Sequence, residues 1–133
     1  MLTSIMTKTT GSLLSADVGG RIYLDYAPDY AEYPSVVFFI VAGNPDRTFT
    51  ERYTDTLIQF SLFSASGGAA EITTMHTHLK ALFDECTLTI TGSVLVWMKE
   101  ESLTTMVDDV VTVGAATQVR HWACDYTIKT SLN

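Results

Sequence analysis

The chain has 133 residues, 47% of them hydrophobic and 17% charged, and a chain of this length can bury about two-thirds of its extended surface. This composition excludes intrinsic disorder, and the longest apolar run, 36–42, is far shorter than the roughly 20 residues of a membrane-spanning helix. Eight basic and 15 acidic residues give a formal charge of -7, without the basic cluster that binding to DNA phosphates needs. DNA could therefore pass close to such a surface without adhering to it.

The N-terminal region predicts a helix followed by a short extended segment. Apolar residues recur every three or four positions over 1–16, which is typical of a helix face, although residues 9–11 weaken its middle. The glycine pair at 19–20 interrupts the chain, and 21–24 predicts a short strand. The region lacks the apolar stretch and cleavage site of a secretory leader, so we expect the protein to be made and kept in the cytoplasm.

Two longer strands are predicted after the turn-rich segment 27–33. Proline disfavours helical backbone in the residue before it, so the chain after Tyr33-Pro34 should begin extended. Segment 35–42 is rich in β-branched and aromatic residues, which predicts a strand that ends at 43–45. Within 54–64, apolar and polar residues alternate, which predicts one core face and one solvated face. The core face would carry Ile58, Phe60 and Leu62, and the solvated face Gln59 and Ser61.

A central helix and two further strands complete the chain. Residues 69–85 carry apolar side chains at the spacing of an amphipathic helix. These side chains are Ile72, Met75, Leu79, Leu82 and Phe83. Segments 93–98 and 119–130 predict strands, and the second alternates. Its core side would carry Trp122, Cys124, Tyr126 and Ile128. Between these strands, 99–114 predicts a long acidic hairpin arm or a mobile loop.

The order of helix, strands, helix and strands predicts a single α+β domain over 1–133. The strands fall into two groups, one before and one after the long central helix, and strands within a group are adjacent in the sequence. This arrangement favours a mostly antiparallel sheet. We expect its apolar face to be covered by the N-terminal helix and by the central helix over 69–85.

The cysteines and histidines do not form a recognisable chemical motif. Cys86 and Cys124 stand among apolar residues without a C-x-x-C pattern, which indicates two reduced, buried thiols. His76 and His78 are two apart on a predicted helix, so their side chains diverge and cannot chelate one metal ion. His121 and Cys124 should lie on opposite faces of the last strand, and a pairing of Cys86 with a distant histidine stays open. The sequence thus predicts no metal site.

Two pairs of adjacent carboxylates stand in the acidic segment. Paired carboxylates can act as acid and base where burial separates their pKa values. Nothing apolar surrounds Glu100 and Glu101, or Asp108 and Asp109, closely enough to indicate burial, so we expect solvated loop charges that act through electrostatics. The glycines match no phosphate-binding loop. We therefore expect no catalytic residues, no cofactor and no enzymatic activity.

Five apolar residues in otherwise polar segments suggest contacts with other subunits. A chain with a mean hydropathy of +0.19 and few charges is prone to expose apolar patches, and such patches mark association surfaces. The candidates are Phe49, Tyr53, Leu103, Met106 and Val107. The alternative is that these five residues belong to the core, on strands that the hydrophobic pattern of the sequence does not reveal.

The layout over about 17–130 resembles the tail-completion, or tail-terminator, proteins of long-tailed bacteriophages and prophages. The most specific fragments are 20–23 (Gly-Arg-Ile-Tyr) and Tyr33-Pro34 leading into the apolar strand. The helix with 79–83 and the final strand with 122–126 (Trp-Ala-Cys-Asp-Tyr) continue the match. Members of the family often have proline after the position of Tyr23 and an aromatic residue after Tyr33-Pro34, where this chain has Leu24 and Ser35.

The resemblance implies a non-enzymatic virion protein that forms a homo-oligomeric ring, typically a hexamer, at the head–tail interface. Such a ring caps the tail tube, stops its polymerisation and contacts the head–tail connector, while DNA passes through the lumen without specific binding. Glu100, Glu101, Asp108 and Asp109 are the candidates for lining that lumen. The alternatives are a head-completion or connector protein, a small ligand-binding or enzymatic domain, and an oligomeric scaffold encoded by a host.

Overall fold

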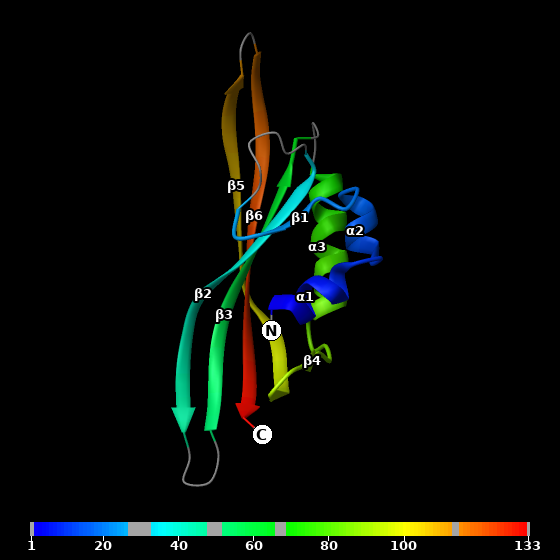
Figure 1. Ribbon diagram of the computed structural model, residues 1–133. Coiled ribbons are helices and arrows are strands. Elements are labelled where there is room, and N and C mark those ends of the chain that lie inside the picture. The colour runs from blue at the N-terminus through cyan, green and yellow to red at the C-terminus, as the bar shows by residue number, and fades with distance from the viewer. Residues whose placement is uncertain (1, 27–32, 48–51, 66–68, 113–114, 133) are drawn as a thin grey trace.

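The computed structural model describes residues 2–26, 33–47, 52–65, 69–112 and 115–132 (Figure 1). The described elements are α1 (Leu2–Thr9), α2 (Leu13–Asp17), β1 (Ile22–Leu24), β2 (Ser35–Arg47), β3 (Arg52–Ser64), α3 (Ala70–Phe83), β4 (Thr89–Ile90), β5 (Ser93–Thr112) and β6 (Ala115–Leu132). None of these helices has the length and hydrophobicity needed to span a bilayer.

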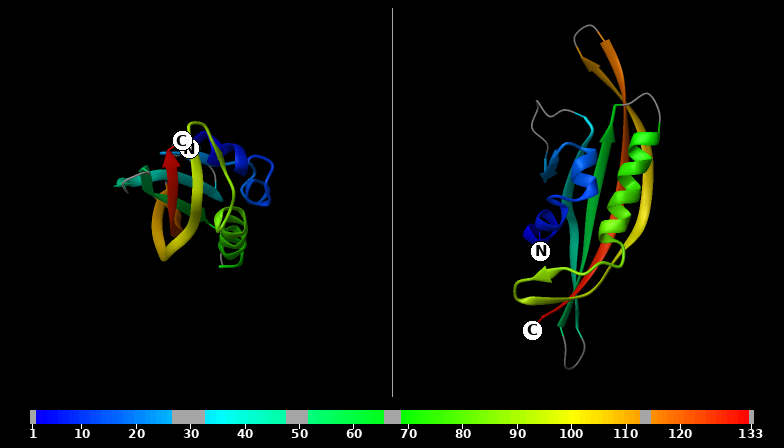
Figure 2. Two further views of the ribbon diagram at one scale, coloured as in Figure 1. Left: turned by 90° about the horizontal axis from the view of Figure 1, so that it is seen from below. Right: turned by 90° about the vertical axis from the view of Figure 1, so that its right-hand side faces the viewer.

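The six strands form one sheet, and the helices cover one face of it (Figures 1 and 2). The strand order is β1-β2-β3-β6-β5-β4. The predicted α+β class is confirmed. The sheet is antiparallel as expected, except that β1 is parallel to β2 because the chain crosses over between them.

The core lies between α3 and the middle of the sheet. Phe60 on β3 is its centre, with ring centroids 5.6 Å from Phe38, 5.0 Å from Phe83 and 5.4 Å from Tyr126. The predicted core residues of 54–64, of the central helix and of the last strand are buried, except that Leu82 and Trp122 are only partly so. Ser61 is also buried, so the opposite face is less solvated than the alternation predicts.

The N-terminal region forms two helices rather than the single helix predicted over 1–16. Gly11 has a φ of +75°, a left-handed conformation that ends α1 and that residues other than glycine rarely adopt. Ser12 then starts α2, because its hydroxyl accepts a hydrogen bond from the Ser15 amide at 3.2 Å and donates one to the Thr9 carbonyl at 2.6 Å. The weak middle of the predicted helix is thus a real break.

We expect Ser12→Ala to lower the free energy of unfolding by about 1 kcal/mol, because α2 loses its cap. Urea denaturation followed by circular dichroism would measure the change. Thr7→Ala, at an exposed position of α1, is the control and should have little effect. An equal loss in both variants would contradict the capping role.

The strands are longer than the sequence predicts. β2 continues through Pro45 to Arg47 instead of ending at 43–45, and β5 and β6 extend the predicted strands 93–98 and 119–130 until they form one long hairpin. The hairpin-arm prediction for 99–114 is therefore confirmed over the described residues 99–112, where the mobile-loop alternative is wrong. The central helix begins and ends within two residues of the predicted 69–85.

The two most specific fragments of the predicted family pattern contact each other. Arg21 Nε donates a hydrogen bond to the Pro34 carbonyl at 2.9 Å, and its Nη2 donates to the Tyr33 carbonyl at 3.4 Å. The Val36 amide donates to the Arg21 carbonyl at 3.0 Å. The arginine before β1 thus fixes the entry of β2 into the sheet.

Candidate functional site

The long hairpins project beyond the helices at opposite ends of the molecule (Figures 1 and 2). At one end, β3 stops at Ser64, opposite Arg120, whereas β5 and β6 stay paired as far as Thr112 and Ala115. We call residues 101–112 of β5, with the β6 residues that pair with them, the β5–β6 arm. The described β5 side chains of this arm, 101–107, are all exposed, whereas Val119, Ala123 and Cys124 on β6 are buried.

Three of the predicted contact residues gather on this arm. Leu103, Met106 and Val107 have exposed fractions of 38%, 37% and 53%. They lie on a strand, as the alternative interpretation supposed, but they are exposed and are not core residues. Beyond Glu100, none of the strands that the structure describes pairs with the outer edge of β5. An open strand edge with apolar side chains is a surface with which a strand of another chain can pair.

The other two predicted contact residues do not join this surface. Tyr53 lies on β3 near the opposite end and is half-buried, with Lys129 Nζ 4.9 Å from its ring centroid. Phe49 lies outside the described residues. Sequence reasoning missed Ile40 and Val41, which are nearly half exposed although they belong to the apolar run that predicts a buried strand.

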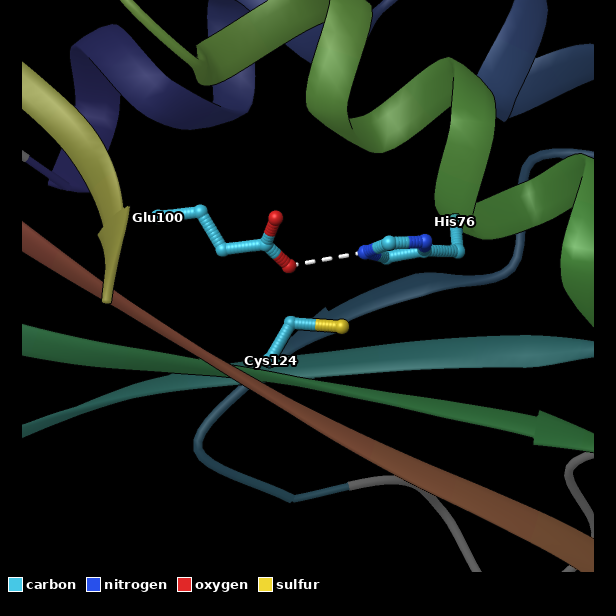
Figure 3. A group of neighbouring side chains, drawn as sticks. All are labelled: His76, Glu100 and Cys124. Atoms are coloured by element: carbon cyan, nitrogen blue, oxygen red, sulfur yellow. Dashed lines mark hydrogen bonds and ion pairs between the residues drawn. The ribbon is translucent and has the colours of Figure 1, made fainter. Parts of the chain in front are cut away.

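A second candidate feature lies beneath α3, where three side chains converge (Figure 3). His76 Nε2 and Glu100 Oε1 are 2.7 Å apart, and Cys124 Sγ completes a group whose ligating atoms all lie within 4.8 Å of one another. These residues come from α3, β5 and β6. A register shift of β5 between Glu100 and Ser102 lets both Glu100 and Leu103 lie on the side of the helices.

Charged neighbours hold Glu100 in place. Lys80 Nζ lies 3.6 Å from its second carboxylate oxygen, and the Glu100 amide donates a hydrogen bond to Asp84 Oδ1 at 3.1 Å. Its side chain is only 12% exposed, so the prediction of a solvated loop charge is wrong for Glu100. Glu101 is exposed and 4.0 Å from Lys99 Nζ, whereas the side chains of Asp108 and Asp109 lie outside the described part of β5.

The thiol of this cluster is protonated at neutral pH. Burial, with smaller contributions from Glu100 and Asp125, raises the pKa of Cys124 to about 12. A protonated thiol is a poor nucleophile, so the cluster does not present the activated cysteine of a thiol enzyme. Burial also raises the pKa of Tyr126, whose buried hydroxyl has no hydrogen-bond partner among the described residues.

We expect the protein to lose stability as the pH rises above about 9. The unfolded chain ionises Cys124 near pH 9 while the folded chain holds the proton to about pH 12, so alkaline pH favours unfolding by up to about 1.4 kcal/mol per pH unit. Urea denaturation between pH 6 and pH 11 would measure this slope. In Cys124→Ala the slope should be smaller, and between pH 6 and pH 8 the difference from wild type should be constant. An unchanged alkaline slope would contradict the assignment.

The remaining histidines and cysteine have neighbours outside this cluster. His78 hydrogen-bonds Asp17 and so joins α3 to α2. His121 stacks on Phe63 with ring centroids 4.4 Å apart and is half-buried. Cys86 Sγ lies 3.7 Å from Met98 Sδ. Both cysteines are free, as predicted, but only Cys124 is fully buried.

The fold resembles that of a virion component. No protein-family model and no curated protein sequence matches the chain. Among solved structures, a chain of the virion of a native gene transfer agent particle aligns with a TM-score of 0.76 over 98% of this chain and 94% of that chain, at 12% sequence identity. This chain therefore shares its fold, over nearly its whole length, with a chain of that particle.

Proposed function

We propose that this protein is a non-enzymatic structural protein of a phage virion, and that it forms a ring, typically a hexamer, that caps the tail tube. The ring terminates tube polymerisation because it covers the growing end and offers the next tube subunit no matching face. Its other side contacts the head–tail connector. Assembly takes place in the cytoplasm of the host bacterium.

The β5–β6 arm is the observation that carries this proposal. Beyond Val107 and Arg120, β5 and β6 pair only with each other among the described strands. A two-stranded ribbon is marginal by itself, so contact with a neighbouring chain is what would hold this end of the arm in place. At the base of this ribbon, where β6 still pairs with β3, the exposed side chains of Leu103, Met106 and Val107 supply apolar contact area. The arm meets a different surface on the neighbouring copy, and such a head-to-tail contact generates a ring when the rotation closes.

The negative charge fits a passage for DNA. With a formal charge of -7, a ring of identical copies repels the DNA backbone and keeps it from adhering while it passes. Glu101, Asp108 and Asp109 belong to the arm and are the candidates for lining the lumen. Glu100 contributes less to the lumen charge because its side chain is largely buried and lies beside Lys80. The likeness in fold to a virion chain supports the same function.

Light scattering and electron microscopy of the purified protein, alone and with tail-tube subunits, test the proposal. We expect rings of a single stoichiometry, either free or on tube ends, and shorter tubes when the protein is present. A chain that stays monomeric at every concentration, with tube ends present, would overturn it. In a phage that lacks the gene, overlong or unattached tails support a terminator, whereas leaking heads indicate a head-completion protein.

A further inference from the structure

The group beneath α3 contains three kinds of metal-ligating atom. His76 offers an imidazole nitrogen, Glu100 a carboxylate oxygen and Cys124 a sulfur, and Figure 3 shows the three side chains pointing toward one another. These are the donor types that zinc takes in proteins, where three protein ligands commonly leave a fourth position for water. Each ligand comes from a different element, so a bound ion would join α3, β5 and β6.

We propose that His76 Nε2, the Glu100 carboxylate and Cys124 Sγ bind one divalent cation of the zinc class. With a neutral imidazole, the carboxylate and the thiolate balance the two positive charges of the ion, so the ion and its three ligands carry no net charge, and Lys80 stays beside the second carboxylate oxygen. The thiol proton leaves for solvent when the ion binds. The inference goes beyond the proposed function and does not depend on ring formation.

The distances are close to those of a tetrahedral site. Bonds of about 2.0 to 2.3 Å place neighbouring ligand atoms roughly 3.3 to 3.6 Å apart. The contact between His76 and Glu100, 2.7 Å, is slightly shorter than this, and the widest separation in the group is at most 4.8 Å. Side-chain rotations that shift an atom by about 1 Å close the difference. His76 and Glu100 keep some exposure, 19% and 12%, which gives the ion and its water a route.

The surroundings suit an ion that carries water. The Trp122 ring lies edge-on to the His76 ring at 5.9 Å between centroids, which orients the imidazole. Tyr126 is paired with Glu100 across β5 and β6, and its buried hydroxyl has no partner among the described residues. Buried hydroxyls are nearly always hydrogen-bonded, and a water on the ion is a candidate partner for this one.

Titration of the tag-free protein with Co²⁺ and Zn²⁺ tests this inference. Cobalt takes the same donor sets as zinc, and a cobalt–thiolate bond has a charge-transfer absorption in the near ultraviolet. We expect one equivalent of Co²⁺ per chain with this absorption, its displacement by Zn²⁺, and a melting temperature several degrees higher with Zn²⁺. Cys124→Ala should abolish the absorption, and His76→Gln should lower the affinity at least about 100-fold.

Matched variants identify the ligands. Cys86→Ala removes the other thiol, and His78→Gln removes the other histidine of α3, and both should bind Co²⁺ as wild type does. If Cys124→Ala fails to fold, Glu100→Gln with His76→Gln decides the question. Absence of the thiolate absorption in wild type, or its loss in Cys86→Ala with retention in Cys124→Ala, would overturn the inference. Ring formation is measured separately by light scattering, so its failure leaves this result unaffected.

Discussion

Replacing Leu103 and Val107 together by aspartate should abolish self-association while the subunit stays folded. Both side chains are exposed, so the free energy of unfolding of the single subunit should change by less than about 1 kcal/mol. Apolar anchors at the centre of an interface each contribute about 2 kcal/mol or more, and two buried charges add a desolvation cost, so assembly should weaken by at least about 1000-fold. Light scattering over a range of protein concentrations would measure the strength of self-association.

Val94 and Val96 provide the matched control for this experiment. They lie on the same strand, are exposed to 49% and 47%, and stand near the opposite end of β5. Aspartate at both positions introduces the same charge without touching the β5–β6 arm. Assembly should survive this change. If both pairs of substitutions abolish assembly equally, the arm is not the specific contact, and net charge is the better explanation.

Local patterns in the sequence predicted the part of the molecule where helix meets sheet. Alternation in 54–64 and helical spacing in 69–85 arise because one face of each element is buried, and Phe60 and Phe83 do meet in the core. The hairpin ends could not be predicted in this way. The described β5 side chains of the arm, 101–107, are all exposed, so no alternation of buried and exposed residues marks this part of the strand. Pro45, which indicates a turn, lies where β2 is an edge strand and proline is tolerated.

The cluster of His76, Glu100 and Cys124 illustrates a different limit. Its members are separated by 24 residues from one to the next along the chain, so no motif spacing relates them. They meet only because α3 lies across β5 and β6, and because a register shift near Glu101 sets which residues of β5 face the helix. The spacing of His76 and His78 concerns only those two side chains, which contact Glu100 and Asp17 respectively. It carried no information on the two strands that lie beneath them.

Replacing Phe60 by alanine should cost about 3 to 5 kcal/mol of folding free energy, which is a large share of the stability of a domain of this size. Phe60 is fully buried and contacts three aromatic rings, one each from β2, α3 and β6, so its loss opens a cavity that none of these elements can fill alone. Urea denaturation at a concentration where the chain is monomeric would measure the loss, because assembly would otherwise add to the apparent stability.

Phe39→Ala is the matched control. Phe39 is half-buried on the opposite face of β2 and should cost about 1 kcal/mol. If the alanine variant does not fold, Phe60→Leu should still lose about 1 to 2 kcal/mol, and equal losses at positions 60 and 39 would contradict a core centred on Phe60.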